Sequence, residues 1–286
     1  AEEFARESRI HEIVKKHSDY VRYPIFVGDD EEQANRQVAI WRQSPREVKD
    51  EDYQEFYQHL TLDFEPPLEH IHTVVDAPLR LYALLYIPTN PEKNVFSLRK
   101  EDGLKLYARK ILIQEYTTEL LPKYFRFIQG VVDAEDLPLN VSRETIQSNP
   151  LIIRIRKILT SQVINKLEQI AKKDDELYEK FWNVYSNFLK EGIATAEDGR
   201  EELYPLLRFK TTKVVDRLSS LNDYIGRMKA GQKKIYYILG DDETSVLQSP
   251  HLDYFNKHEY EVITFTNAMD SFMLINLREY EGFEFT

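Results

Sequence analysis

The sequence of 286 residues contains no cysteine. This absence excludes disulfide bonds, thiol catalysis and cysteine-bound zinc. Glycine is scarce, with nine residues, and none of them forms a G-x-G-x-x-G or P-loop pattern, so phosphate-binding loops of those kinds are excluded. A G-x-S-x-G nucleophile motif is also missing, and no apolar run approaches the roughly 20 residues of a membrane span. The sequence therefore shows no complete active site of these kinds.

Positive charge is also in deficit. The 38 lysines and arginines are outnumbered by 49 aspartates and glutamates, which gives a formal net charge of −11. Because a surface of this sign repels polyphosphates and anionic lipids, we expect neither nucleic acid nor a membrane as a partner. The histidines are scattered: His70 and His72 can share a strand face, but no further ligand follows at metal-binding spacing. We therefore expect no metal site.

The order of the periodic segments predicts an α/β chain. Residues 1–20 are interpreted as a connector, and residues 21–168 as a large α/β-sandwich subdomain whose aromatic and β-branched runs predict strands. A helical connector is predicted over 169–203 and a smaller α/β subdomain over 204–286. The predicted strands are residues 23–30, 79–88, 104–113, 124–133, 235–240 and 260–266. The predicted helices are residues 50–60, 152–170, 174–192 and 245–258.

The stretch EDLPLNVSRETIQSNP, residues 135–150, combines a helix start with an unusual charge. Ser142 is a good N-cap, and the next residue is Arg143, although the N-terminus of a helix already carries partial positive charge. An anion bound there gains from the helix dipole, and an arginine adds a planar fork of donors suited to phosphate oxygens. Gln147 lies one turn further on the same face, and Asn140 can hydrogen-bond the loop backbone.

The residues alone leave a second interpretation of Arg143 open. The side chain points to solvent or pairs with a nearby carboxylate, Glu135 or Asp136, as surface arginines usually do. The local sequence thus motivates a phosphate contact without deciding between the two.

Five stretches together resemble the heat-shock protein 90 chaperone family. The resemblance covers nearly the whole chain, but only the middle domain of that family, and it is closest to the bacterial high-temperature protein G branch, with the mitochondrial paralogue second. The N-terminal nucleotide-binding domain and the C-terminal dimerisation domain are then expected outside this sequence. The stretches are HSDYVRYPI (17–25), DEDYQEFYQHL (50–60), GVVDAEDLPLNVSRETIQ (130–147), LLRFKTT (206–212) and SLNDYIGRMKAGQKKIYYILG (220–240).

The resemblance implies roles for particular residues. Arg143 would contact the γ-phosphate of ATP held by the N-terminal domain, Gln147 would assist there, and Asn140 would hold the loop. Leu112 would pack toward the nucleotide-binding domain. Trp41 would be an exposed tryptophan in contact with client proteins, although its surroundings, AIWRQSP, depart from the family's PLW-x-x-N-P pattern. The alternative for Trp41 is a side chain packed on the helix that contains Tyr53.

The function implied by the resemblance is that of a middle domain in an ATP-dependent molecular chaperone. ATP and Mg²⁺ would be bound mainly by the N-terminal domain, so the isolated chain is expected to be inactive as an ATPase. The implied partners are unfolded or partly folded clients, the protein's own N- and C-terminal domains, and a second copy in a homodimer. The implied location is the cytoplasm, with the mitochondrial matrix as alternative. The rival interpretations are a platform that only binds clients and co-chaperones, and an autonomous hydrolase, which the missing nucleophile disfavours.

Overall fold

A computed structural model describes residues 6–29, 31–77, 79–90, 101–139, 146 and 149–286. The chain divides into two compact units, Ala1–Val163 (unit 1) and Ile164–Thr286 (unit 2). Helix α4 (Pro150–Lys173) contains the point of the sequence at which unit 1 ends and unit 2 begins. The mixed α/β fold class is confirmed, while the finer segmentation at residues 20, 168 and 203 stays a prediction.

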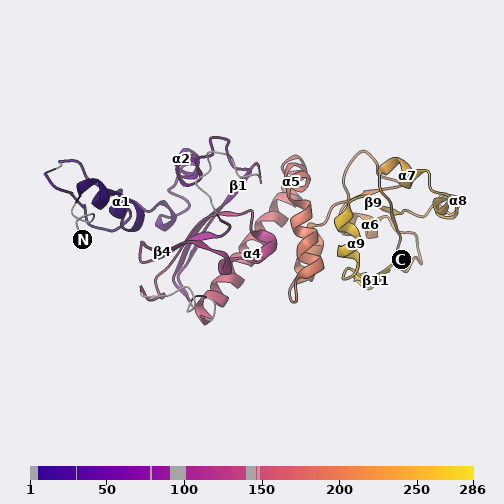
Figure 1. Ribbon diagram of the computed structural model, residues 1–286. Helices are drawn as coiled ribbons and strands as arrows, with labels where there is room; N and C mark the ends of the chain where they lie inside the picture. The colour runs from indigo at the N-terminus through magenta and orange to yellow at the C-terminus, as the bar shows by residue number, and fades with distance from the viewer. Residues whose placement is uncertain (1–5, 30, 78, 91–100, 140–145, 147–148) are drawn as a thin grey trace. The chain divides into compact units, whose positions relative to one another are not determined.

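Unit 1 is built on a five-stranded sheet with the order β1-β2-β5-β3-β4. Strands β3 and β5 run parallel, and the other neighbours are antiparallel. Figure 1 shows α2 on one side of this sheet and the first half of α4 on the other, so the middle strands β2 and β5 are buried on both faces. The strands are β1 (Glu69–Val75), β2 (Leu81–Ile87), β3 (Leu104–Ala108), β4 (Ile111–Thr117) and β5 (Gln129–Ala134). The helical elements before α4 are α1 (Glu7–His17), η2 (Ile40–Arg42), α2 (Asp50–Thr61), η3 (Thr118–Leu120) and η4 (Lys123–Phe125).

The single strand predicted over 104–113 is wrong, because this segment is a hairpin. Strands β3 and β4 are joined by Arg109 and Lys110, whose φ angles are 52° and 68°. A two-residue hairpin loop with both φ angles positive normally uses asparagine or glycine, so arginine and lysine gave no turn signal in the sequence. Two other strand predictions also need correction: residues 23–29 form no strand, and the segment predicted over 124–133 is extended only from Gln129.

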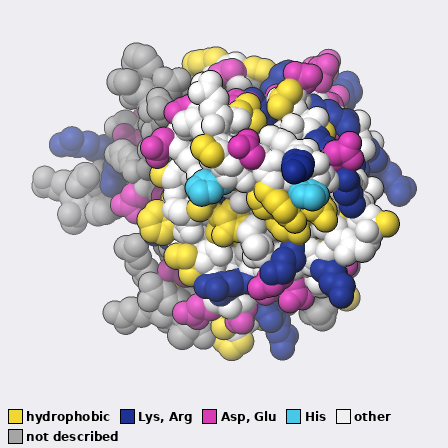
Figure 2. Space-filling view, turned by 90° about the vertical axis from the view of Figure 1, so that its right-hand side faces the viewer, with side chains coloured by type: hydrophobic (Ala, Val, Ile, Leu, Met, Phe, Trp, Pro, Cys, Tyr) yellow, Lys and Arg dark blue, Asp and Glu magenta, His cyan; other side chains and the backbone are white. Residues whose placement is uncertain are grey.

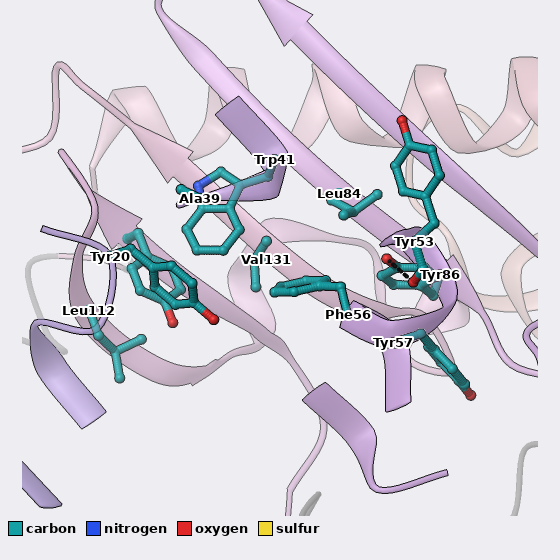
Figure 3. Packing of buried hydrophobic residues seen from close by; sticks show 11 residues of the cluster. Tyr20, Ala39, Trp41, Tyr53, Phe56, Tyr57, Leu84, Tyr86, Leu112 and Val131 are labelled. Carbon is teal, nitrogen blue, oxygen red and sulfur yellow. Dashed lines mark hydrogen bonds between the residues drawn. The ribbon is translucent and has the colours of Figure 1, made fainter. Parts of the chain in front are cut away.

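One face of the unit 1 sheet carries an aromatic core. Trp41 of η2 and Phe56 of α2 pack over Val131 of β5, and Tyr86 of β2 donates a hydrogen bond from its hydroxyl to the Tyr53 carbonyl at 2.9 Å (Figure 3). Aromatic side chains of this size bury a large apolar area each and fix the helix on the sheet. The buried members of the cluster are Tyr20, Ala39, Trp41, Tyr53, Phe56, Tyr57, Leu84, Tyr86, Tyr107, Leu112 and Val131.

The two long helices follow their predicted periodicity closely. In α4 the apolar residues spaced by three and four positions are all buried, which confirms the predicted amphipathic helix. The buried stripe comprises Ile152, Ile155, Leu159, Val163, Leu167 and Ile170. Helix α5 (Asp175–Thr195) is N-capped by Asp174, whose side chain accepts a hydrogen bond from the Leu177 amide. It continues past Gly192, where the sequence predicted its end, because Gly192 is buried inside the helix.

Unit 2 contains two small sheets, β6-β9-β8 and β10-β11-β7, each of three strands. The helix predicted over 245–258 is interrupted at Pro250, because proline lacks the amide hydrogen that a helix interior needs. The three pieces are α7 (Glu243–Leu247), η6 (Pro250–Leu252) and α8 (Asp253–Lys257). The strands are β6 (Lys210–Thr211), β7 (Lys234–Ile235), β8 (Tyr237–Leu239), β9 (Ile263–Phe265), β10 (Glu279–Tyr280) and β11 (Phe283–Phe285). The other helical elements after α5 are η5 (Arg200–Leu206), α6 (Leu221–Gly226) and α9 (Ala268–Leu274).

The surface of unit 2 is mixed in character. Figure 2 looks at the end of this unit that carries α7 and α8, and it shows hydrophobic side chains near the middle of the face beside histidines, with lysines and arginines around them. Leu247 of α7 and Tyr254 of α8 are exposed apolar residues of these helices. In the described part of the chain, none of the helices has the length and apolar character needed to cross a membrane.

Candidate functional site

The segment that the sequence predicts to be functional, residues 135–150, joins β5 to α4. Asn140, Arg143 and Gln147 lie outside the described residues, so their roles stay predictions. Both ends of the segment are described, and so is Ile146, whose side chain is buried. The described part of the site therefore consists of the residues that hold these two ends.

Asp133, next to last in β5, provides the main anchor at the first end. Its side chain is 0% exposed, and its Oδ2 accepts hydrogen bonds from Trp41 Nε1 at 3.1 Å and Arg42 Nε at 2.7 Å. The Lys110 backbone amide also donates to this carboxylate, at 3.3 Å from Oδ1 and 3.2 Å from Oδ2. A buried charge is tolerated only when it is paired and hydrogen-bonded, and here the donors come from η2 and from the turn between β3 and β4.

The Arg42 guanidinium connects two carboxylates on this edge of the sheet. Its Nε donates to Asp133, and its Nη1 donates to Glu135 Oε1 at 2.7 Å. Its Cζ lies 4.6 Å from the centre of the Tyr82 ring, so the planar group stacks on β2. Burial acts to lower the pKa of Arg42, but the hydrogen bonds and charges of Asp133 and Glu135 outweigh it and leave that pKa raised. Arg42 thus keeps its charge despite being largely buried.

Glu135 is held from two sides as the chain leaves β5. Its Oε2 accepts a hydrogen bond from Arg80 Nη1 at 3.3 Å, and its amide donates to the Arg80 carbonyl at 3.1 Å. Burial acts to raise the pKa of Glu135, but hydrogen bonds from Arg42 and Arg80 outweigh it and leave that pKa lowered. The Arg80 amide in turn donates to Asp136 Oδ2 at 3.2 Å. Glu135 thus pairs with two arginines, and the alternative in which it or Asp136 also neutralises Arg143 stays open, because Arg143 lies outside the described residues.

The second end of the segment is a capped helix start. The Asn149 side-chain oxygen accepts a hydrogen bond from the Leu151 amide at 2.9 Å, and the Asn149 amide donates to the Ile146 carbonyl at 3.2 Å. Pro150 is the first residue of α4, a position that suits proline because no intrahelical bond needs its amide. The described helix thus begins at Pro150, and the start predicted at Ser142 lies outside the described residues.

Trp41 does not have the exposure that the family resemblance implied. Its side chain is 0% exposed, so the expectation of an exposed tryptophan is wrong. The ring centroid lies 4.5 Å from that of Tyr20, 5.7 Å from that of Phe56 in α2 and 5.1 Å from that of Tyr107. The alternative in which Trp41 packs against the helix of Tyr53 agrees with this position (Figure 3). A buried ring bonded to Asp133 gives no basis for assigning client contact to Trp41.

Leu112 belongs to the same aromatic cluster. It lies on β4 opposite Tyr107 of β3 and near Tyr20, and its side chain is buried (Figure 3). Its predicted packing toward a nucleotide-binding domain stays a prediction.

The two histidines considered as metal ligands have packing roles instead. His72 Nε2 donates to the Trp41 carbonyl at 3.1 Å, so in the neutral ring Nδ1 accepts from the Tyr53 hydroxyl at 2.7 Å. The His70 ring stacks on Tyr53 with centroids 4.0 Å apart. Within the described ranges, no group of three or more histidine, aspartate and glutamate side chains is arranged to hold a metal ion.

Sequence reasoning identified the loop but missed the residues that anchor it. The available signal was Asp133 itself, a carboxylate at the end of the otherwise apolar run Gly130–Ala134. A charge within a strand that reads as buried requires a partner. Its partners Trp41 and Arg42 lie 92 and 91 residues earlier in the chain, so local patterns did not connect them.

Comparison with known proteins gives the family of the chain. The family model described as Hsp90 protein matches residues 27–286. The chain belongs to the Hsp90 family. The predicted resemblance to heat-shock protein 90 and its bacterial high-temperature protein G branch is thereby confirmed.

The curated relatives carry the name "Chaperone protein HtpG". The relative from Desulfitobacterium hafniense is 41% identical over 284 residues, which cover 99% of this chain and 46% of the relative. That from Chlorobaculum tepidum is 39% identical and is covered to 45%, and that from Francisella tularensis subsp. novicida is 41% identical and also covered to 45%. The chain thus spans less than half the length of these Hsp90 relatives, and the region matched to the Hsp90 model includes the whole anchored segment from Asp133 to Pro150.

Proposed function

We propose that this chain is the middle domain of an ATP-dependent molecular chaperone and supplies Arg143 to the γ-phosphate of ATP. The observation that carries the proposal is the Hsp90 family match, which includes the S-R-E motif at residues 142–144. The chain lacks the glycine-rich phosphate-binding loops named above, so ATP is assigned to an N-terminal nucleotide-binding domain. No metal-holding cluster occurs among the described side chains, so Mg²⁺ is assigned to that domain as well.

The chemistry proposed for Arg143 is electrostatic. A guanidinium presents fixed donors to phosphoryl oxygens while negative charge redistributes in the transition state. Arginines acting in this way contribute about 10³–10⁵-fold to the rate in other phosphoryl-transfer systems. A loop anchored at both ends favours such a role, because catalysis by positioning needs a defined geometry. In this proposal Gln147 assists at the phosphate and Asn140 holds the loop.

The direct test replaces Arg143 in the full-length protein. Arg143→Ala is expected to lower ATP turnover by at least about 10²-fold while ATP affinity changes little, because the nucleotide is held elsewhere. Arg154→Ala, which removes an exposed arginine from α4, is the matched control and should leave turnover unchanged. Turnover in Arg143→Ala equal to that of the unmodified protein would refute the catalytic role and favour the pure binding platform. Turnover by the isolated chain would instead support the autonomous hydrolase.

The second part of the proposal is a client-binding surface. Because Trp41 is buried, we assign this surface to other residues. Phe272 of α9 and Ile275 at its C-terminal end are 56% and 57% exposed. Residues three positions apart lie on the same helix face, so the two side chains form a small apolar surface. Unfolded proteins display apolar segments, and such a surface offers them a contact that the folded chain itself does not use.

The client surface is tested with the double variant Phe272→Ser/Ile275→Ser. Its affinity for a fluorescently labelled unfolded protein is expected to fall about 10-fold, because two apolar anchors are lost. Tyr254→Ser, which removes another exposed aromatic side chain from unit 2, is the control and should keep its affinity. Unchanged affinity in the double variant would remove α9 from the proposal without affecting the role of Arg143.

Homodimer formation through a C-terminal domain and a cytoplasmic location, with the mitochondrial matrix as alternative, complete the proposal. Both rest on what membership of the Hsp90 family implies.

A further inference from the structure

Packing alone does not account for the buried carboxylate of Asp133. The neighbouring residues of β5, Val131, Val132 and Ala134, are apolar and fully buried. Replacing a buried ion pair by apolar residues of similar size is often neutral or stabilising, so the pair formed by Arg42 and Asp133 is not needed for a stable core. Arg42 also keeps a buried Nη2 that makes no hydrogen bond among the described residues. These features point to a role in geometry.

The contacts of this network converge on the residues at which the chain leaves the sheet. Asp133 is bonded to η2 and to the Lys110 amide, Glu135 to Arg42 and Arg80, and Asp136 to the Arg80 backbone. In addition, Arg109 Nε donates to the Glu135 carbonyl at 3.1 Å. Because consecutive residues are held from different elements, both the position and the direction of the backbone after Ala134 are determined.

We infer that Arg42 and Asp133 are positioning residues for the segment that carries Asn140 and Arg143. The inference rests on the proposed function of Arg143. The Arg42 fork holds Asp133 near the end of β5 and Glu135 just after it, with N–O distances of 2.7 Å to each. Neither residue is proposed to touch ATP: they act by fixing where the loop begins. A displacement of about 1 Å at a catalytic group can cost 10²-fold in rate, so such an anchor matters for turnover.

The test compares two arginines that both bind Glu135. Arg42→Met keeps an apolar stem over Tyr82 but removes the fork between the two carboxylates. Arg80→Met also removes a partner of Glu135, but the Arg80 side chain is 65% exposed, and exposed pairs contribute little. In the full-length protein, Arg42→Met is expected to lower the turnover number about 10- to 100-fold with unchanged ATP affinity. Arg80→Met is expected to stay within about twofold of the unmodified protein. Equal turnover in Arg42→Met and the unmodified protein would overturn the inference.

A double variant separates positioning from a general structural effect. If Arg42 acts through Arg143, then Arg42→Met causes no further loss of turnover in the Arg143→Ala background. Losses that multiply would show that Arg42 acts independently and would overturn the inference. Normal turnover in Arg143→Ala alone would instead refute the proposed function, whereas low turnover there with normal turnover in Arg42→Met would refute only the positioning role.

A readout independent of turnover completes the test. Amide hydrogen exchange of Glu135, Asp136 and Leu137 is expected to be faster in Arg42→Met than in Arg80→Met, because the first variant loses the anchor. Equal protection in the two variants would contradict the inference. Should Arg42→Met fail to fold, Asp133→Asn serves as the second variant, since it keeps the shape and one acceptor oxygen but removes the charge. It is expected to show the same faster exchange and lower turnover.

Discussion

Each unit of the chain buries one tryptophan beside one buried ion pair, and the two pairs are built differently. In unit 1, Trp41 donates to Asp133, whose carboxylate also accepts from Arg42 and the Lys110 amide. In unit 2, the Lys190 ammonium lies 5.7 Å from the centre of the Trp182 ring and 2.6 Å from Asp270. The first pair holds three separate segments at the end of a strand, and the second joins helices α5 and α9. Asp133 accepts from donors of two other segments and so defines a geometry. Asp270 accepts from the Asn267 amide at the start of its own helix, at 3.0 Å, so its pair with Lys190 mainly links α9 to α5.

Removing each carboxylate in turn tests the difference between the two buried ion pairs most strongly. Asp133→Leu leaves Arg42, the Trp41 indole and the Lys110 amide without their acceptor, so the free energy of unfolding of unit 1 should fall by about 3–5 kcal/mol. Asp270→Leu leaves Lys190 and the Asn267 amide without this acceptor, which is one donor fewer than at Asp133, so the expected loss is about 1–3 kcal/mol. Urea unfolding measures both losses. The chain has two tryptophans, so Trp182→Phe leaves Trp41 to report on unit 1 and Trp41→Phe leaves Trp182 to report on unit 2.

Removing both partners of each pair supplies the control. Lys190→Met in the Asp270→Leu protein should restore most of the lost stability, because no unpaired charge remains and the Asn267 amide belongs to an exposed residue at a helix start. Arg42→Met in the Asp133→Leu protein should restore less, since the Trp41 indole and the Lys110 amide still lack an acceptor. Equal recovery in the two units would contradict the distinction between them.

Mild acid should also affect the stability of the two units differently, although the expected effect is smaller. Burial lowers the pKa of His72, and the hydrogen bond to the Trp41 carbonyl only partly opposes this shift. Burial, followed by the charge of Arg36, also lowers the pKa of His59. Because the folded pKa values lie below the unfolded value of about 6.5, the unfolded chain takes up more protons as the pH falls through that value. The stability contributed by neutral His72 is thus complete at pH 7 and is lost progressively below pH 6.5.

The free energy of unfolding reported by Trp41 should therefore fall between pH 7 and pH 5 more than that reported by Trp182, because His59 and His72 both belong to unit 1. His72→Gln keeps a donor for the Trp41 carbonyl and should reduce this pH dependence. A pH dependence that is the same with and without His72→Gln would show that His72 does not contribute to it.

What the sequence could predict follows from the range of the interactions involved. The stripe from Ile152 to Ile170 depends on neighbours three and four positions apart, so its periodicity predicted α4 well. The fold class and the family were also accessible, whereas the role of the segment 135–150 stays a prediction. The exposure of Trp41 was not, because its acceptor Asp133 lies 92 residues away. Strands β3 and β4 were merged for a related reason: two charged residues form their turn, and local propensity does not place such residues in a left-handed conformation.

The same turn has a consequence for the order in which unit 1 assembles. Arg109 and Lys110 both adopt left-handed backbone angles, a conformation that is disfavoured for these residues in an isolated hairpin. The bond from the Lys110 amide to Asp133 becomes available only when β5 is in place. We therefore expect β3 and β4 to close late, on a central strand that has already formed. Local chain reversal in this part of the molecule thus depends on a contact of long range, which slows folding because the entropy of closing the larger loop must be lost first.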